Sequence, residues 1–352
     1  MLGGAWLTGA LHAIASETGW DPGSSDYIVG TSAGSMVGAL LACGVPPWLM
    51  LAASAGEIDP WRGASGAAAS TAYRSPIAGY QLHRGAPLLG PGSWRLAVSS
   101  LARPYKYSPA ALLAGWLPLG PISTEPFKDT VRRVCGDSWA PHPNYWPIAT
   151  DYQTGGRIAF GRADAPQADL PDAVAASCAI PGLFRAVEIG GRRYVDGGLT
   201  SASNLDVLEN ESLDLVVALN PMSSLHADAP HTFGERIGYA LRQASGRRLG
   251  SEAKRLRAAG SEVVLIQPTV HDLDAMGTNL MNRRRRREVV ETAVQTVTEH
   301  LHESSVGERL AELPNGLPEL LQRPGGPTHT WPDFPALARS RWKDVAHDAI
   351  RG

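Results

Sequence analysis

Apolar, strand-like runs alternate with helical patterns along this chain, and that alternation constrains its fold more than any other feature. Residues 26–30, 213–219 and 262–267 are short apolar runs with the length of buried strands. A helical pattern over 32–42 follows the first run, and a longer one over 233–259 separates the other two. Strands and helices in this order form a mostly parallel sheet with helices on both faces. We therefore expect an α/β fold.

Two hairpins are expected in the middle of the chain. Residues 146–151 and 157–160 flank a Gln-Thr-Gly-Gly turn, and residues 185–189 and 192–195 flank a Gly-Gly pair. Helices are also expected over residues 1–14, 123–133, 170–177 and 284–302.

Residues 52–119 have weak periodicity and are rich in Gly, Ala, Pro, Ser and aromatic side chains. We expect short helices and loops there, which form either a lid over a site or an irregular packed flank. Three roles are open for the aromatic residues of this stretch: lining an acyl pocket, resting at a membrane interface, or packing in an ordinary core. The sequence does not decide between these three roles.

Composition excludes several classes of protein. Of the 352 residues 43% are hydrophobic, which argues against disorder. The 32 Lys and Arg nearly balance the 34 Asp and Glu, so charge gives no case for nucleic-acid binding. The length leads us to expect one large domain over residues 1–310 and a weakly ordered tail over residues 311–352.

The three cysteines and the N-terminal region bear on localisation. Cys43, Cys135 and Cys178 stand far apart without a Cys-x-x-Cys pair, so we expect buried thiols rather than a disulfide framework or a zinc site. A secretory signal requires a basic residue near its start, and no Lys or Arg precedes Arg62. The longest apolar stretch, residues 36–55, is broken by prolines and is too short to span a membrane. These features predict a soluble protein of the reducing cytoplasm.

A candidate nucleophile lies where the first strand meets its helix. Gly30, Ser32 and Gly34 form a Gly-x-Ser-x-Gly pattern, completed by Thr31 and Ala33. A sharp strand-to-helix turn exposes the serine hydroxyl, and the glycines leave room for crossing backbone and for substrate. The helix directs its positive dipole end at charge that develops near the serine. A plain tight turn and a phosphate-binding loop are the alternatives, although the latter lacks the expected lysine.

The serine needs a base, and Asp196 is the better candidate. It follows a strand and precedes Gly197 and Gly198, which allow close backbone approach, although Asp-Gly-Gly alone is more often a turn. An aspartate with a pKa of about 3.9 is a poor base, so it must contact Ser32 in a partly dry site. His271, after the strand at 262–267, is the one histidine placed to compete, and a loop or surface role is expected for it.

Together these motifs resemble the patatin-like phospholipase family. The residues Gly30 to Gly34 match its nucleophile elbow, and Asp196 to Gly198 match its Asp-Gly-Ala/Gly motif. The stretch Ala-Ser-Cys-Ala-Ile-Pro-Gly-Leu-Phe at 176–184 is similar to one that the family carries shortly before that motif. The resemblance covers about residues 2–300.

The resemblance implies a three-layer α/β/α fold with a mostly parallel central sheet. It also implies a Ser–Asp dyad that hydrolyses acyl esters of lipids, in which Ser32 is acylated and Asp196 takes the serine proton and then activates water. It implies no metal and no cofactor.

One departure from the family concerns the oxyanion loop. The family places a glycine-rich loop after its first strand, and in this chain only Gly3 and Gly4 correspond to the trailing end of that loop. We therefore expect that the sequence is truncated and that the missing strand and loop lie upstream. Loss of one oxyanion donor typically raises the barrier by about 2.7–4 kcal/mol.

The function expected from the sequence is a serine acyl hydrolase, either a phospholipase or a carboxylesterase. A lipid-binding or regulatory protein that keeps the fold without turnover is the alternative. The partner is a lipid or acyl-ester substrate, with peripheral membrane contact. A basic run at residues 283–287 contacts anionic headgroups or is a solvated helix face, and the second role is favoured.

Overall fold

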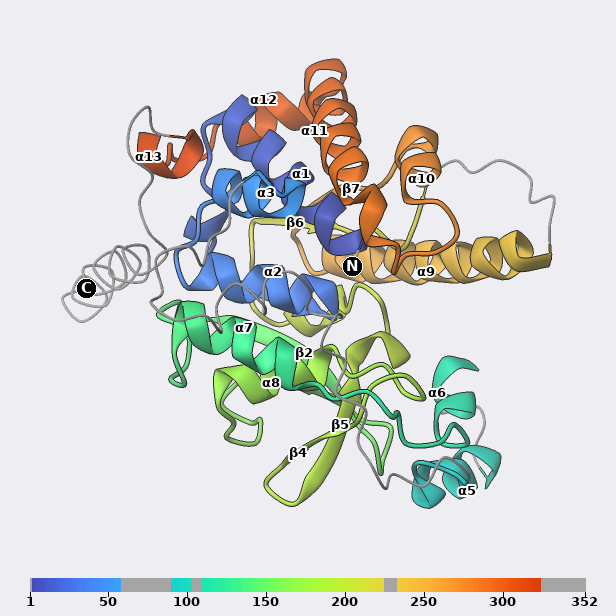
Figure 1. The fold of residues 1–352 in the computed structure, drawn as a ribbon. Helices are drawn as coiled ribbons and strands as arrows, with labels where there is room; N and C mark the ends of the chain where they lie inside the picture. Colours follow the sequence, from blue (N-terminus) through green and yellow to red (C-terminus); the bar gives the residue numbers. More distant parts are fainter. Residues whose placement is uncertain (1, 58–89, 103–108, 225–232, 324–352) are drawn as a thin grey trace. The chain divides into compact units, whose positions relative to one another are not determined.

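The computed structural model describes residues 2–57, 90–102, 109–224 and 233–323 (Figure 1). Contacts divide the chain into two compact units, each assembled from separate stretches. Unit 1 contains Met1–Asp26, Val45–Asp59 and Leu205–His329. Unit 2 contains Tyr27–Gly44, Pro60–Asn204 and Thr330–Gly352.

Unit 2 is built on a mixed sheet. Its strands are β1 (Ile28–Thr31), β2 (Tyr145–Asp151), β3 (Arg157–Ala159), β4 (Val187–Ile189) and β5 (Arg192–Asp196). Its helices are α2 (Ala33–Ala42), α5 (Trp94–Ala102), α6 (Pro109–Ala114), α7 (Glu125–Cys135) and α8 (Leu170–Ser177), with a 3-10 turn, η3, at Gly197–Leu199.

The strand order of this sheet is β1-β2-β5-β4, with β3 paired to β2. Only β1 and β2 run parallel, whereas β2–β3, β2–β5 and β4–β5 are antiparallel. Both expected hairpins are present, and each contributes an antiparallel pair of strands to the sheet. The sheet is therefore mixed, and the expectation of a mostly parallel sheet is corrected.

Helices cover the two faces of β5. Tyr194 packs in a cluster with α8, whereas Val195 packs with Leu96 of α5 and with Tyr152. Consecutive strand residues point to opposite faces, so α8 and α5 lie on opposite sides of this strand. Helices α2, α7 and α8 contact one another.

Unit 1 is mainly helical. Its helices are α1 (Leu2–Thr18), α3 (Pro47–Ala55), α9 (Phe233–Ala258), α10 (Val270–Met276), α11 (Arg286–Glu303), α12 (Ser305–Ala311) and α13 (Pro318–Leu321). Its 3-10 turns are η1 (Pro22–Ser24), η4 (Leu205–Leu208) and η5 (Arg283–Arg285). Strands β6 (Leu215–Leu219) and β7 (Glu262–Ile266) pair in parallel, and α9 connects them as the sequence predicts.

Helix α1 packs closely on α11. Trp6 and Ile14 of α1 are fully buried, and a Cβ at Gly9 would lie 2.8 Å from the Val290 carbonyl oxygen of α11. The crossing therefore requires a glycine. Part of the expected tail is also ordered, because α13 buries Leu320. Residues 324–352 of that tail lie outside the described part.

One expectation about the cysteines is wrong. Cys43, at the end of α2, forms a disulfide with Cys135, the last residue of α7, whereas Cys178 is free and buried as expected. The two bonded residues are 92 positions apart, so only the fold reveals their proximity. The disulfide removes the cysteine argument for a reducing compartment, and a cytoplasmic location stays a prediction.

Among the helices in the described ranges, none combines the length and the apolar character that crossing a membrane requires.

Candidate active site

Ser32 occupies a strained turn between β1 and α2. Its φ of 54° and ψ of −121° lie in a region that non-glycine residues rarely adopt. A Cβ at Gly30 would lie 2.5 Å from the Gly34 carbonyl oxygen, so the turn requires a glycine at this position. The space around a Cβ built on Gly34 is open to 4 Å. The elbow geometry expected from the sequence is therefore present.

Buried side chains hold the backbone of this turn. The Ser32 N–H donates to Ser177 Oγ at 3.0 Å, and Ser177 Oγ donates to the Ile148 carbonyl of β2 at 2.6 Å. The Ser32 carbonyl accepts from Ser35 Oγ at 2.7 Å and from Cys178 Sγ at 3.2 Å. Such surroundings stabilise a backbone conformation that would otherwise relax.

The sheet register places Asp196 next to this turn. Thr31, the last residue of β1, pairs with Ile148 of β2, and the next residue, Ala149, pairs with Asp196 at the end of β5. Ser32 and Asp196 therefore leave neighbouring positions of one sheet. The Ser32 side chain lies near enough to the Asp196 carboxyl to lower its pKa through hydrogen bonding.

Burial controls the ionisation of Asp196. Only 5% of the residue is exposed, and burial raises the pKa of its carboxyl to about 6. Hydrogen bonds from the Ser32 side chain and the Gly198 N–H lower this pKa in part, the second at 2.7 Å to Oδ1. A carboxylate with a pKa near neutrality accepts a proton more readily than an ordinary aspartate.

Gly197 and Gly198 differ in their roles. A Cβ at Gly197 would collide with the Ile148 carbonyl oxygen, so this glycine permits the close approach to β2 that the sequence suggests. Gly198 is exposed, and its N–H orients the carboxyl.

Free backbone donors lie beside Ser32. N–H groups in the first turn of an α-helix have no intrahelical acceptor. Because Ser35 and Met36 donate to the Ser32 carbonyl, the N–H groups at this end of α2 without an acceptor among the described residues are those of Ala33 and Gly34. They can stabilise negative charge that develops next to the serine.

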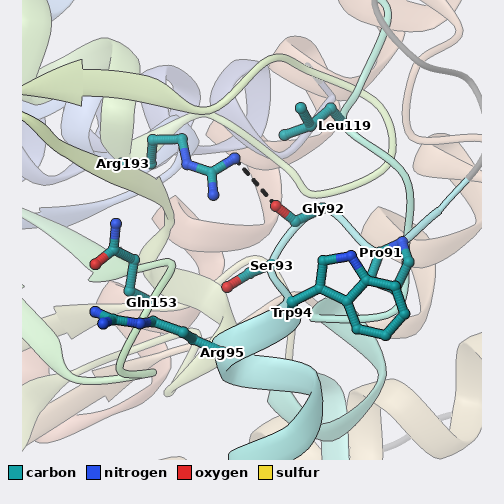
Figure 2. Close-up of a pocket in the computed structure, with 8 residues that line it drawn as sticks. All are labelled: Pro91, Gly92, Ser93, Trp94, Arg95, Leu119, Gln153 and Arg193. Carbon is teal, nitrogen blue, oxygen red and sulfur yellow. Dashed lines mark hydrogen bonds between the residues drawn. The ribbon is translucent and has the colours of Figure 1, made fainter.

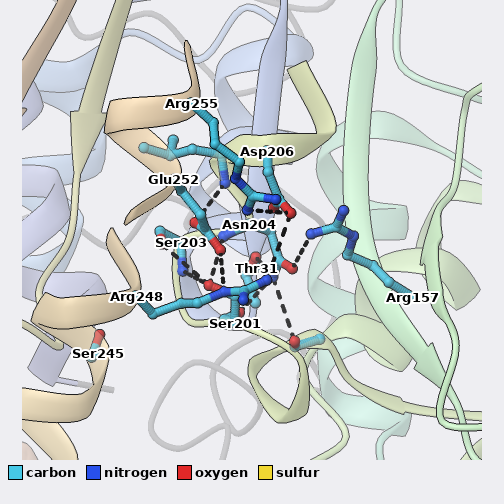
Figure 3. A network of polar contacts seen from close by, with 12 residues as sticks. Thr31, Arg157, Ser201, Ser203, Asn204, Asp206, Ser245, Arg248, Glu252 and Arg255 are labelled. Atoms are coloured by element: carbon cyan, nitrogen blue, oxygen red, sulfur yellow. Dashed lines mark hydrogen bonds and ion pairs between the residues drawn. The ribbon is translucent and has the colours of Figure 1, made fainter. Parts of the chain in front are cut away.

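Asn204 joins the loop after Asp196 to the elbow, and the sequence did not single it out. It is fully buried, and its side-chain amide donates to Thr31 Oγ1 at 3.0 Å and to the Ser201 carbonyl at 2.5 Å (Figure 3). Its φ is 50°, which asparagine tolerates better than most residues. Ser177 was missed too, since a serine inside a helical pattern carries no signal of its distant partner.

The remaining predicted residues lie in unit 1. Gly3 and Gly4 lie in the first turn of α1, within the helix expected over residues 1–14, and their correspondence to the oxyanion loop stays a prediction. His271 is an exposed residue of α10. In the described part of the chain, no group of three or more His, Cys, Asp or Glu is arranged to hold a metal ion.

A family model provides independent support for the resemblance. The model described as patatin-like phospholipase matches residues 1–209, more than half of the 352-residue chain. The match includes the elbow, the buried serine and cysteine at 177–178 and the Asp-Gly-Gly motif, and it ends earlier than the 2–300 expected from the sequence. The family is one of lipid acyl hydrolases with an α/β fold, and this chain belongs to the patatin-like phospholipase family.

Proposed function

We propose that this protein is a serine carboxylic ester hydrolase that cleaves acyl esters of lipids, with Ser32 as nucleophile and Asp196 as base. The observation that carries the proposal is the Ser32 hydroxyl, held at a positive-φ turn beside a buried carboxyl whose pKa is about 6. Family membership supports a lipid as substrate.

In the acylation step Ser32 Oγ attacks the ester carbonyl carbon, and the Asp196 carboxylate takes the hydroxyl proton. The resulting oxyanion accepts hydrogen bonds from the N–H groups of Ala33 and Gly34. When the tetrahedral intermediate collapses, the protonated Asp196 gives its proton to the leaving alcohol, and the acyl group remains on Ser32.

In the deacylation step Asp196 takes a proton from water, which attacks the acyl carbon. Collapse releases the fatty acid, and Asp196 returns the proton to Ser32 Oγ. One buried aspartate therefore serves as base and acid in both halves of the reaction.

Hydrolysis of a soluble chromogenic ester tests these roles. We expect Ser32→Ala to abolish turnover and Asp196→Asn to lower kcat by about 100-fold or more, because general acid–base catalysis contributes 10²–10⁴-fold. His271→Ala is the control and should keep full activity, since His271 is an exposed helix residue. Undiminished turnover in either site variant, or loss in His271→Ala, would contradict the proposal.

A non-catalytic lipid-binding protein is the other outcome of this test. Such a protein would bind lipid but show no ester turnover that depends on Ser32.

A further inference from the structure

Exposed apolar side chains are concentrated on one part of unit 2. Six of the nine large hydrophobic residues that the structure shows exposed lie on α5, on α6 or directly after α6, and they are 42–68% exposed. We call them the α5–α6 face: Trp94, Val98, Leu101, Leu113, Trp116 and Leu117.

Helix α5 has apolar side chains on two sides, one buried and one exposed. Trp94, Val98 and Leu101 follow the i, i+4, i+7 spacing of one helix face and are more than half exposed. The other side of α5 buries Leu96 against Tyr152 and Val195 of the sheet region. The helix is therefore anchored on one side, and its other apolar side faces solvent.

Hydrogen bonds and a ring contact connect the two parts of the α5–α6 face. The Gly92 N–H donates to the Leu117 carbonyl at 2.7 Å, and the Ser93 N–H donates to the Gly115 carbonyl at 3.2 Å. The rings of Trp94 and Trp116 meet edge to face at 6.3 Å between centroids. These contacts fix the start of α5 to the segment after α6.

A basic pocket adjoins the face (Figure 2). It has a volume of about 300 Å³ and is lined by Pro91, Gly92, Ser93, Trp94, Arg95, Leu119, Gln153 and Arg193. Arg193 is held in place, because its Nη1 donates to the Gly92 carbonyl at 3.1 Å and its guanidinium lies over the Tyr152 ring. Within the described ranges, neither Arg95 nor Arg193 forms an ion pair, although Glu188 of β4 lies opposite Arg193 in the strand register.

We propose that the α5–α6 face docks on a phospholipid membrane and that this pocket binds the phosphate of one lipid headgroup. Tryptophan is enriched where a protein meets the membrane interface, and amphipathic helices bury their apolar side there. Guanidinium groups bind phosphate through paired hydrogen bonds. The choice of a lipid as the source of the phosphate rests on the proposed function.

The bound lipid serves docking instead of catalysis. Arg193 and Asp196 lie three residues apart on β5, about 10 Å along a strand, and positions separated by three point to opposite faces. The pocket and the Asp196 carboxyl therefore belong to different sides of this strand. Loss of the pocket should weaken membrane binding and leave the turnover of a soluble ester unchanged.

Vesicle co-sedimentation of Ser32→Ala protein tests the proposal without hydrolysis of the vesicles. Vesicles of phosphatidylcholine alone are compared with vesicles that contain one quarter phosphatidylglycerol. Arg95→Gln should weaken partition to the anionic vesicles about fivefold, and Arg95→Gln with Arg193→Gln about 25-fold, since each basic residue contributes about 1 kcal/mol at an anionic surface. Val98→Ser with Leu101→Ser should weaken binding to both vesicles by about tenfold or more.

A charge-matched control comes from the basic run of unit 1. Arg284 and Arg287 are exposed, so Arg284→Gln with Arg287→Gln removes the same charge as the pocket double variant. This control should stay within about twofold of the parent protein. The single variant Arg95→Gln guards against misfolding, because Arg95 is exposed and Arg193 packs on Tyr152.

Several results would overturn the proposal: unchanged binding in Arg95→Gln, equal weakening in the unit 1 control, or full binding in the Val98/Leu101 variant. Inorganic phosphate that binds through Arg95, with vesicle binding intact, would assign the pocket to a soluble anion. A dimer that the Val98/Leu101 variant dissociates would assign the face to a second copy. Turnover of a soluble ester by protein with Ser32 intact separates this test from the proposed function. Absence of turnover would reject the proposed enzymatic function, whereas vesicle co-sedimentation would still show whether the α5–α6 face binds membranes.

Discussion

Burial of the Asp196 carboxyl affects stability as well as chemistry. Its pKa rises from 3.8 to about 6 on folding, so between these pH values the unfolded chain holds fewer protons than the folded one. The folded state therefore loses stability as the pH rises from about 4 to about 6, by at most about 3 kcal/mol. Well above pH 6 the Asp196 carboxyl is ionised in the folded protein, and the free energy of unfolding is lowered by the full cost of burying that charge.

Asp196→Asn should accordingly stabilise the protein while it inactivates it. The amide carries no charge, and its oxygen can still accept from the Gly198 N–H. We expect urea unfolding at pH 7.5 to show the variant up to about 3 kcal/mol more stable than the parent, with the difference shrinking towards pH 4. Ser32→Ala is the control: it keeps the Asp196 carboxyl, so its stability should still fall with rising pH, over a range moved upward because the Ser32 hydrogen bond that lowers this pKa is lost. A variant that is less stable than the parent at pH 7.5 would contradict this.

Ser177 positions the nucleophile through the backbone. Ser177→Ala leaves the partly buried Ser32 N–H and the buried Ile148 carbonyl without this partner, which should lower the free energy of unfolding by about 1–3 kcal/mol. The Ser32 turn should also relax, so kcat for a soluble ester should fall on the order of tenfold to a hundredfold with KM little changed.

The matched control for Ser177 is Ser100→Ala. Ser100 is a buried serine that bonds within α5, so its loss should affect stability but not kcat. A Ser177→Ala protein with normal kcat would show that the turn holds its shape without this serine.

At the scale of elements, the contact between the end of β1 and the start of α2 depends on Gly30. Gly30→Ala would place a Cβ 2.6 Å from the Ser35 Cα, an atom of the α2 backbone that cannot move alone. We expect a loss of about 3 kcal/mol or more, read from the urea midpoint. Gly34→Ala meets no atom within 4 Å and should unfold like the parent. Equal stability of the two variants would refute this account of the turn.

The Cys43–Cys135 disulfide joins α2, whose N-cap is Ser32, to α7. It links residues 92 positions apart, so Cys43→Ser should lower the free energy of unfolding by about 2–5 kcal/mol under oxidising conditions. The parent should lose a similar amount in reductant, whereas the variant should be indifferent to it. Peptide mapping that finds three free thiols in the oxidised protein would contradict the pairing.

Local patterns predicted most elements correctly because each has its own signal. The strand before Ser32, the helix after it, both glycine turns and the long α9 follow from apolar periodicity and turn residues. The disulfide, the Ser177 bridge and the Asn204 contacts could not be predicted, since each joins residues that only the fold brings together. The two short helices α12 and α13 were also missed, because short segments carry weak periodicity.

At the scale of the whole molecule, the sequence predicts the fold class but not the strand directions. Alternating strands and helices suggest a parallel sheet, and the two hairpins of unit 2 make it mixed instead. The three-layer arrangement and a single domain over residues 1–310 stay predictions. The structure answers only in part what the aromatic side chains of residues 52–119 do. Trp94 and Trp116 are exposed, whereas Trp61, Tyr73 and Tyr80 lie outside the described residues.

Covalent labelling with a fluorophosphonate tests directly whether Ser32 and Asp196 act as a catalytic pair. The rate of labelling is measured as a function of pH, and the labelled residue is located by peptide mass spectrometry. We expect one adduct, on Ser32, whose rate of formation rises with pH around a midpoint near 6, the pKa of Asp196. In Asp196→Asn the rate should fall by about 100-fold or more above pH 6, and the rise around pH 6 should disappear. An adduct on another side chain, or Ser32 labelled as fast in Asp196→Asn as in the parent, would contradict the claim that these two residues act together.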